Sequence, residues 1–260
     1  MEKSKYKIIL IAFFVIFIGL IVFVFCFKDE KVQTLKRYYS DSEKTYVHQY
    51  IIRNGDTILH GDVIVYNKKG IKVAKGNLIN NVPKGEFIYY YDNGKIESIK
   101  YVLGNKKDAE YLWNYPNGKI EKYVFFNDLG EPYFIISYDE KGPTQYEGPT
   151  IKNIYHKKFN SKKHNDIQDN QYFRVGDTLI HQYLVANIPN AKRSFTVENV
   201  GNDNVKVKRT ITPKPPTTID VKEILTKKGK NTIRAVVKYE FKDDIVPAIN
   251  DTLSFDVEVH

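Results

Sequence analysis

Residues 85–102, GEFIYYYDNGKIESIKYV, and residues 109–126, AEYLWNYPNGKIEKYVFF, are two copies of one pattern that are 24 positions apart. Glycines recur at the same spacing over four units: Gly70, Gly94, Gly118 and Gly142. A fixed period of 20 to 50 residues is typical of repeat architectures, in which each unit packs mainly against its neighbours. We therefore expect a repeat region over residues 46–142.

Each unit is expected to form a β-hairpin. Asn93-Gly94 and Asn117-Gly118 are dipeptides that supply the positive φ angles of a two-residue type I′ turn. Large side chains alternate with a period of two before and after these turns, which predicts strands. Stacked hairpins would place equivalent aromatic side chains on adjacent strands and build a meandering antiparallel sheet.

Aromatic side chains of this sheet are the candidate binding residues. Both faces carry aromatic or apolar side chains, which is more than a sheet with one solvated face requires. Tyrosine and tryptophan are also enriched at the energetic centres of protein interfaces. The candidates are Tyr89, Tyr91, Trp113 and Tyr115. The simpler interpretation is that these rings only pack between neighbouring strands.

The segment GEFIYYYDNGK at residues 85–95 resembles the MORN-repeat family, in the form of its bacterial antitoxin-like YwqK variant. The resemblance covers about residues 61–142. It implies a β-hairpin scaffold that contacts proteins or lipids. Ala109 replaces a unit-opening glycine and Asp139 replaces the last tyrosine, and such decay is expected of a capping repeat.

The N-terminal region contains an apolar run, Ile8 to Phe27, without a charged side chain. As a helix with a rise of 1.5 Å per residue it would span about 30 Å, the hydrocarbon thickness of a bilayer. No small-residue cleavage site follows, so we expect an uncleaved transmembrane helix in the cell membrane. The bulk of the chain is then extracytoplasmic. Cys26 leaves a lipoprotein anchor as the alternative.

Two further segments follow the repeats. Residues 143–170 lose hydrophobic periodicity, and their candidate basic contacts are Lys157, Lys158, Lys162 and Lys163. These lysines would contact anionic headgroups or an acidic partner, or would simply be the charged side chains of a solvated linker.

Residues 171–260 contain short alternating runs separated by turn signals, which predicts about seven strands and an immunoglobulin-like β-sandwich. The Pro213–Pro216 run should lie at a strand edge or in a loop. We expect this segment to fold on its own.

Several function classes are excluded or disfavoured by composition. The formal net charge of +9 is spread along the chain, which argues against nucleic-acid binding. One cysteine excludes an intramolecular disulfide framework and a cysteine-based zinc cluster. The sequence contains no nucleophile-elbow, zinc-protease or phosphate-loop motif. We therefore expect no catalytic residue, cofactor, metal ligand or small-molecule substrate.

The sequence thus predicts a mainly β chain with five segments. They are an N-terminal tail and transmembrane anchor (1–27), a stalk (28–45), MORN-like repeats (46–142), a basic linker (143–170) and an immunoglobulin-like sandwich (171–260). The expected function is that of a non-enzymatic, membrane-anchored interaction or scaffolding subunit whose partner is another envelope protein. Two alternatives stay open: an antitoxin-like or immunity-like protein that neutralises a partner, and an enzyme with an unrecognised site.

Overall fold

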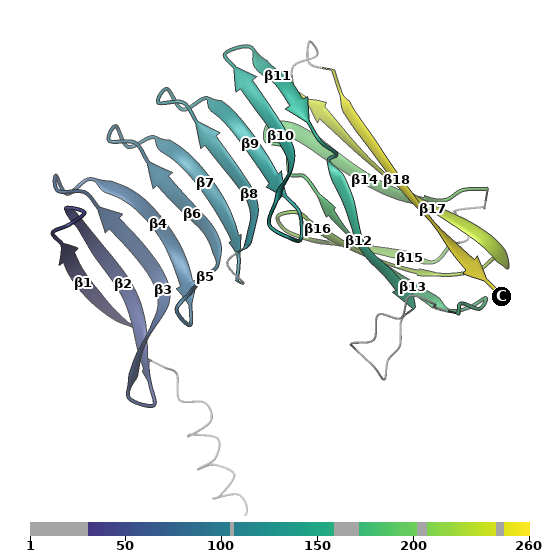
Figure 1. The fold of residues 1–260 in the computed structure, drawn as a ribbon, viewed down its shortest axis with the longest axis horizontal. Coiled ribbons are helices and arrows are strands. Elements are labelled where there is room, and N and C mark those ends of the chain that lie inside the picture. The colour runs from purple at the N-terminus through teal and green to yellow at the C-terminus, as the bar shows by residue number, and fades with distance from the viewer. Residues whose placement is uncertain (1–30, 105–106, 159–171, 202–206, 243–246) are drawn as a thin grey trace, which may run out of the picture.

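The computed structural model describes residues 31–104, 107–158, 172–201, 207–242 and 247–260 (Figure 1). Every regular element in these ranges is a β-strand, and no helix in them is long and apolar enough to cross a membrane. This corrects the expected fold class, which combined a mainly β chain with an N-terminal transmembrane helix. The apolar run at residues 8–27, on which that helix rested, lies outside the described residues.

The repeats form one eleven-stranded antiparallel sheet that grows hairpin by hairpin (Figure 1). Its strands are β1 (Gln33–Tyr39), β2 (Lys44–Arg53), β3 (Asp56–Tyr66), β4 (Lys72–Ile79), β5 (Val82–Pro83), β6 (Gly85–Tyr90), β7 (Ile96–Leu103), β8 (Lys107–Asn114), β9 (Ile120–Phe126), β10 (Pro132–Asp139) and β11 (Gly142–Glu147). The predicted meander is confirmed. The sheet also begins earlier than expected, because β1 lies in the expected stalk and pairs with β2 along its whole length.

The turns at the Asn-Gly dipeptides differ from the expected type I′ turns. Gly94 N donates to Tyr91 O at 2.9 Å and Tyr91 N donates to Lys95 O at 2.9 Å, so three residues lie in the loop. Within it only Gly94 has a positive φ, of 80°. The Asn93 side chain accepts a hydrogen bond from Lys95 N at 3.0 Å, and this local bond favours the longer turn. A type I turn followed by a left-handed glycine is the observed form.

The C-terminal region is a sandwich of two small sheets. The first has the order β12 (Ile151–Lys158), β13 (Thr178–Val185), β16 (Thr218–Ile224) and β15 (Arg209–Lys214), and the second has β14 (Ala191–Asn199), β17 (Gly229–Phe241) and β18 (Ile249–Val259). Pro213 lies in the edge strand β15, where a missing N–H costs no ladder hydrogen bond.

The sandwich takes its other edge strand from the segment expected to be a linker. Strand β12 pairs antiparallel with β13 from Ile151 to Lys158, so the sandwich sheets reach back before residue 171. Lysines at the end of β12 interrupt the alternation that would have identified it from the sequence. Charged side chains are typical of edge strands, because they discourage pairing with other chains.

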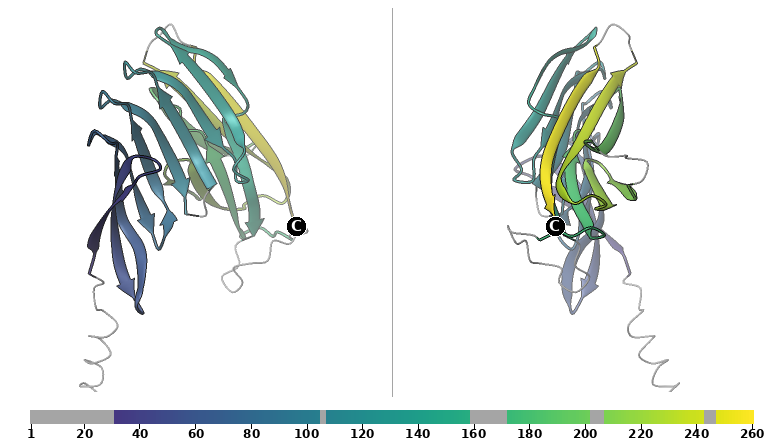
Figure 2. Two further views of the ribbon diagram at one scale, coloured as in Figure 1. Left: turned by 60° about the vertical axis from the view of Figure 1, so that its left-hand side comes forward. Right: turned by 90° about the vertical axis from the view of Figure 1, so that its right-hand side faces the viewer.

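One hydrophobic core joins the last repeats to the sandwich. Phe125 and Phe134 on the large sheet and Tyr183 and Tyr239 in the sandwich belong to the same cluster, and each is fully buried. The views of Figure 2 show the last repeats, in teal, lying against the green and yellow sandwich strands. At the crossing between them, a Cβ on Gly148 would lie 2.1 Å from the Tyr133 carbonyl oxygen, so only glycine fits.

A buried histidine lies on the inner face of β13. His181 Nδ1 is 2.7 Å from the Tyr183 hydroxyl oxygen, and its Nε2 has no hydrogen-bond partner among the described residues. Burial, with smaller contributions from Arg209 and His156, lowers the pKa of His181 to about 3. The folded protein therefore keeps this imidazole neutral where an exposed histidine would be charged.

We expect the stability of the protein to fall on mild acidification. Below pH 6.5 the unfolded chain binds a proton at His181, whereas the folded chain does so only near pH 3. The free energy of unfolding is therefore fully retained above pH 6.5 and should then drop by about 1.4 kcal/mol per pH unit. Urea unfolding at several pH values measures the slope. His181→Phe should flatten it, and an unchanged slope in that variant would refute the assignment.

Candidate binding surfaces

The large sheet has two faces with different roles. Directly paired residues share a face, so Tyr123, Phe125, Phe134 and Ile136 lie together on one face, which we call the core face. The sandwich packs on this face at its C-terminal end. The opposite, outer face carries the row Tyr89, Ser98, Trp113 and Lys122, whose members pair in that order across β6 to β9.

Two of the four predicted aromatic residues therefore lie together on the outer face. Trp113 stacks on Tyr111, with 3.7 Å between ring centroids. Lys122 Nζ lies 6.0 Å from the Trp113 ring centroid, and Lys100 Nζ lies 5.9 Å from that of Tyr111. All of these side chains are half-buried. The result is a partly exposed aromatic surface flanked by two lysines, a composition that suits protein contacts.

The other two predicted aromatics have a structural role at the turns. The Tyr91 hydroxyl donates to Asn114 O at 2.6 Å, and the Tyr115 hydroxyl donates to Tyr138 O at 3.2 Å. Both bonds link one hairpin to the next, because each acceptor lies 23 residues further along the chain. A tyrosine that uses its hydroxyl in this way holds the repeats in register.

The predicted basic contacts are only partly described. Lys157 lies at the end of β12, with its Nζ 4.8 Å from the Tyr155 ring centroid. Lys158 forms an ion pair with Asp177. The structure thus gives both lysines an intramolecular contact. Lys162 and Lys163 lie outside the described residues.

An open cleft of about 320 Å³ lies on the core face, where the sheet meets the loop between β13 and β14. Glu86, Tyr101 and Glu110 line one side and form a row, since Tyr101 pairs with both glutamates across adjacent strands. The loop supplies Ile188, which is 3% exposed, and neighbouring residues on the other side. None of the binding residues predicted from the sequence lines this cleft.

Glu110 is the more buried of the two carboxylates of the cleft. Its Oε2 accepts a hydrogen bond from the Tyr123 hydroxyl at 3.1 Å, and the same hydroxyl accepts one from Asn187 N at 2.8 Å. Burial raises the pKa of Glu110, and the hydrogen bonds from Tyr123 and Asn187 oppose that rise. Tyr123 therefore fixes the carboxylate and joins the repeat sheet to the sandwich loop.

The repeat period does contain a signal for this row. Asp62, Glu86 and Glu110 are each 24 residues apart and follow the opening position of their unit. The alternation of large aromatic residues is more conspicuous and obscures this acidic position. The loop between β13 and β14, which is distant in the sequence, packs beside the sheet. Only there do two of the three carboxylates, Glu86 and Glu110, line a cleft.

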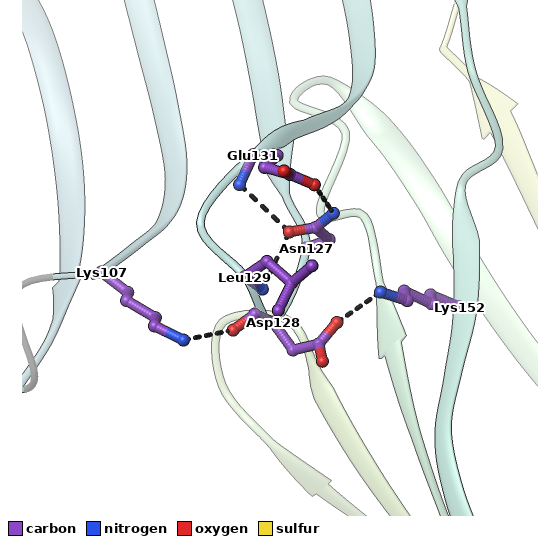
Figure 3. Close-up of polar contacts among 6 residues, drawn as sticks. All are labelled: Lys107, Asn127, Asp128, Leu129, Glu131 and Lys152. Atoms are coloured by element: carbon purple, nitrogen blue, oxygen red, sulfur yellow. Dashed lines mark hydrogen bonds and ion pairs between the residues drawn. The ribbon is translucent and has the colours of Figure 1, made fainter.

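The turn Asn127–Glu131 also connects the repeats to the sandwich (Figure 3). Asn127 Oδ1 accepts hydrogen bonds from Leu129 N at 2.9 Å and from Glu131 N at 3.0 Å, which shapes the turn. Lys107 of the preceding hairpin donates to Asp128 O at 2.7 Å, and Lys152 on β12 forms an ion pair with the Asp128 carboxylate. This cluster fixes the orientation of the turn relative to β12.

No group of three or more histidine, cysteine, aspartate or glutamate side chains that could hold a metal ion occurs in the part of the chain that the structure describes. Comparison with protein-family models and with curated proteins finds no match for this chain. The resemblance to MORN repeats therefore stays a prediction from the sequence.

Proposed function

We propose that the protein acts as a binding or scaffolding subunit and that the outer face of its repeat sheet contacts a partner protein. The observation that carries this proposal is the stacked pair Tyr111–Trp113 between Lys100 and Lys122. Large, rigid aromatic rings contribute most of the energy at many interfaces. Lys100 is already paired with Asp108 at 3.0 Å, so Lys122 is the lysine that favours an acidic partner surface.

The repeat turns support the proposal because they hold this face rigid. Besides the Tyr91 and Tyr115 hydroxyls, Lys95 Nζ donates to Asn117 O of the next turn at 2.7 Å. A surface that is already ordered loses little conformational freedom on binding, and more of the contact energy then appears as affinity. The expectation of a partner in the cell envelope rests on the N-terminal apolar run alone and stays a prediction.

Trp113→Ala should abolish partner capture with only a moderate loss of stability. Because Trp113 is half-buried, its removal should cost well below the roughly 3–5 kcal/mol that a buried ring costs. Co-purification from native membranes with the tagged full chain, together with the melting temperature of each variant, provides the measurement.

Tyr146→Ala is the matched control, since Tyr146 is an aromatic residue on the edge strand β11 with 57% exposure. The same partner should be recovered with this variant and with the unchanged chain. A Trp113→Ala protein that melts far earlier, or that still captures the partner, would show that the ring only packs between strands.

A further inference from the structure

The cleft on the core face presents two negative charges on either side of an aromatic ring. Glu86, Tyr101 and Glu110 are direct neighbours on β6, β7 and β8, so their Cβ atoms are about 5 Å apart along the row. A cation placed above Tyr101 would contact both carboxylates and the ring face together. No anion would be stable in this position.

Neither carboxylate has a cationic partner within the described parts of the chain. Arg193, which acts on Glu110 through its charge, donates from Nη1 to Val185 O and to Ala186 O, at 3.1 Å each. Its guanidinium is thereby held by the sandwich backbone and does not line the cleft. The Glu110 carboxylate accepts hydrogen bonds from Tyr123 and Asn187, which leaves about two of its roughly four lone-pair sites for a ligand.

Part of the remaining lining is apolar and matches an alkyl chain, while Asn187 and Asn190 add polar side chains at the sandwich loop. Ile99 and Leu112 pair directly on β7 and β8, beside the acidic row, and Ile188 closes the cleft from the sandwich loop. The methylene stems of lysine and arginine pack on such surfaces while their charged ends reach polar groups. The cleft therefore combines a short apolar strip with a carboxylate end and polar side chains from the loop.

We infer that this cleft receives a lysine or arginine side chain of a partner protein. The inference rests on the proposed function, because it adds a second contact point, on the opposite face of the sheet, to the same partner. Charge complementarity carries it: the cleft is acidic although the whole chain has a net charge of +9. A basic side chain projecting from a folded surface can enter, since the cleft is open to solvent.

Binding of short blocked peptides to the full chain tests the inference. The probes are acetyl-Gly-Lys-Gly-amide, its arginine equivalent, and a norleucine peptide that lacks the charge but keeps the alkyl chain. Saturation-transfer NMR should detect the lysine and arginine side chains and give their Kd, and the norleucine peptide should bind about tenfold more weakly or not at all, because it cannot make the charge-assisted hydrogen bonds.

Glu110→Gln and Glu86→Gln should each weaken binding of the lysine peptide by about tenfold. Glutamine keeps the shape and can still accept from Tyr123, so Glu110→Gln should retain the fold. Asp62→Asn is the matched control: Asp62 occupies the same repeat position, but it accepts a hydrogen bond from Asn77 at 3.3 Å and lies outside the cleft. Unchanged affinity in both glutamine variants would overturn the inference.

The outcomes also separate this inference from the proposed function. Trp113→Ala should bind the peptides normally while losing the partner, since Trp113 lies on the other face. Peptide binding without any partner capture by the unchanged chain would contradict the proposed function alone. Partner capture without peptide binding would contradict the cleft assignment alone. If free n-butylammonium bound as tightly as the lysine peptide, the result would contradict the inference that the occupant is a protein side chain.

Discussion

Replacing Arg209 by methionine should lower the free energy of unfolding by about 3–5 kcal/mol, the range for a buried ion pair that loses one partner. Arg209 Nε lies 2.6 Å from Glu223 Oε2, and the side chain of Glu223 is fully buried. Arg209 also donates from Nη1 to Val197 O at 2.5 Å. Without the guanidinium, a carboxylate stays in the sandwich interior, where Asn199 Nδ2, at 3.4 Å, is its remaining donor among the described residues.

The control is the double variant Arg209→Met with Glu223→Gln. Glutamine removes the buried charge and can still bond to Asn199, so most of the lost stability should return. Urea unfolding of the two variants and the unchanged chain gives the comparison. A double variant no more stable than Arg209→Met would mean that lost packing of the long arginine side chain, and not the orphaned charge, causes the loss.

Phe134→Ala should cost about 3–5 kcal/mol and should destabilise the repeats and the sandwich together. Phe134 is fully buried and belongs to the core that contains residues of both regions. Its removal leaves a cavity at their junction, where neither region can close it alone. Calorimetry should show a single transition in the unchanged chain that moves to lower temperature in the variant.

Ile135→Ala is the companion measurement, because Ile135 is the next residue on β10, points to the outer face and is half-buried. Its loss should cost clearly less than the loss of Phe134. If Phe134→Ala shifted only part of the unfolding heat, the two regions would unfold independently and the shared core would contribute little to cooperativity.

The repeat sheet was predictable because its signal is local. Glycine spacing and aromatic alternation lie within each 24-residue unit, and adjacent hairpins pair with each other. Finer detail was not predictable from the dipeptide alone: Asn93-Gly94 is compatible with two turn types, and a side-chain hydrogen bond to Lys95 N decides between them. The sandwich strands were recognisable for the same local reason.

What the sequence did not reveal depends on contacts between distant segments. Strand β12 contains several lysines and becomes a strand by pairing with β13, across residues 159–171. Two of the four candidate aromatics, Tyr91 and Tyr115, use their hydroxyls between turns, which their alternation cannot indicate. The cleft needs Ile188, which is 78 positions after Glu110, and no local pattern connects the two.

The sheet has one end fixed to the sandwich and one free end, β1, whose residues are all exposed. Whole hairpins could be gained or lost between these ends without disturbing the shared core. Because neighbouring strands are about 4.8 Å apart, each unit changes the length of the sheet by roughly 10 Å. The number of repeats is thus a molecular ruler: it sets the distance between the sandwich and the first strand, and related chains could adjust their reach by duplicating or deleting a single unit.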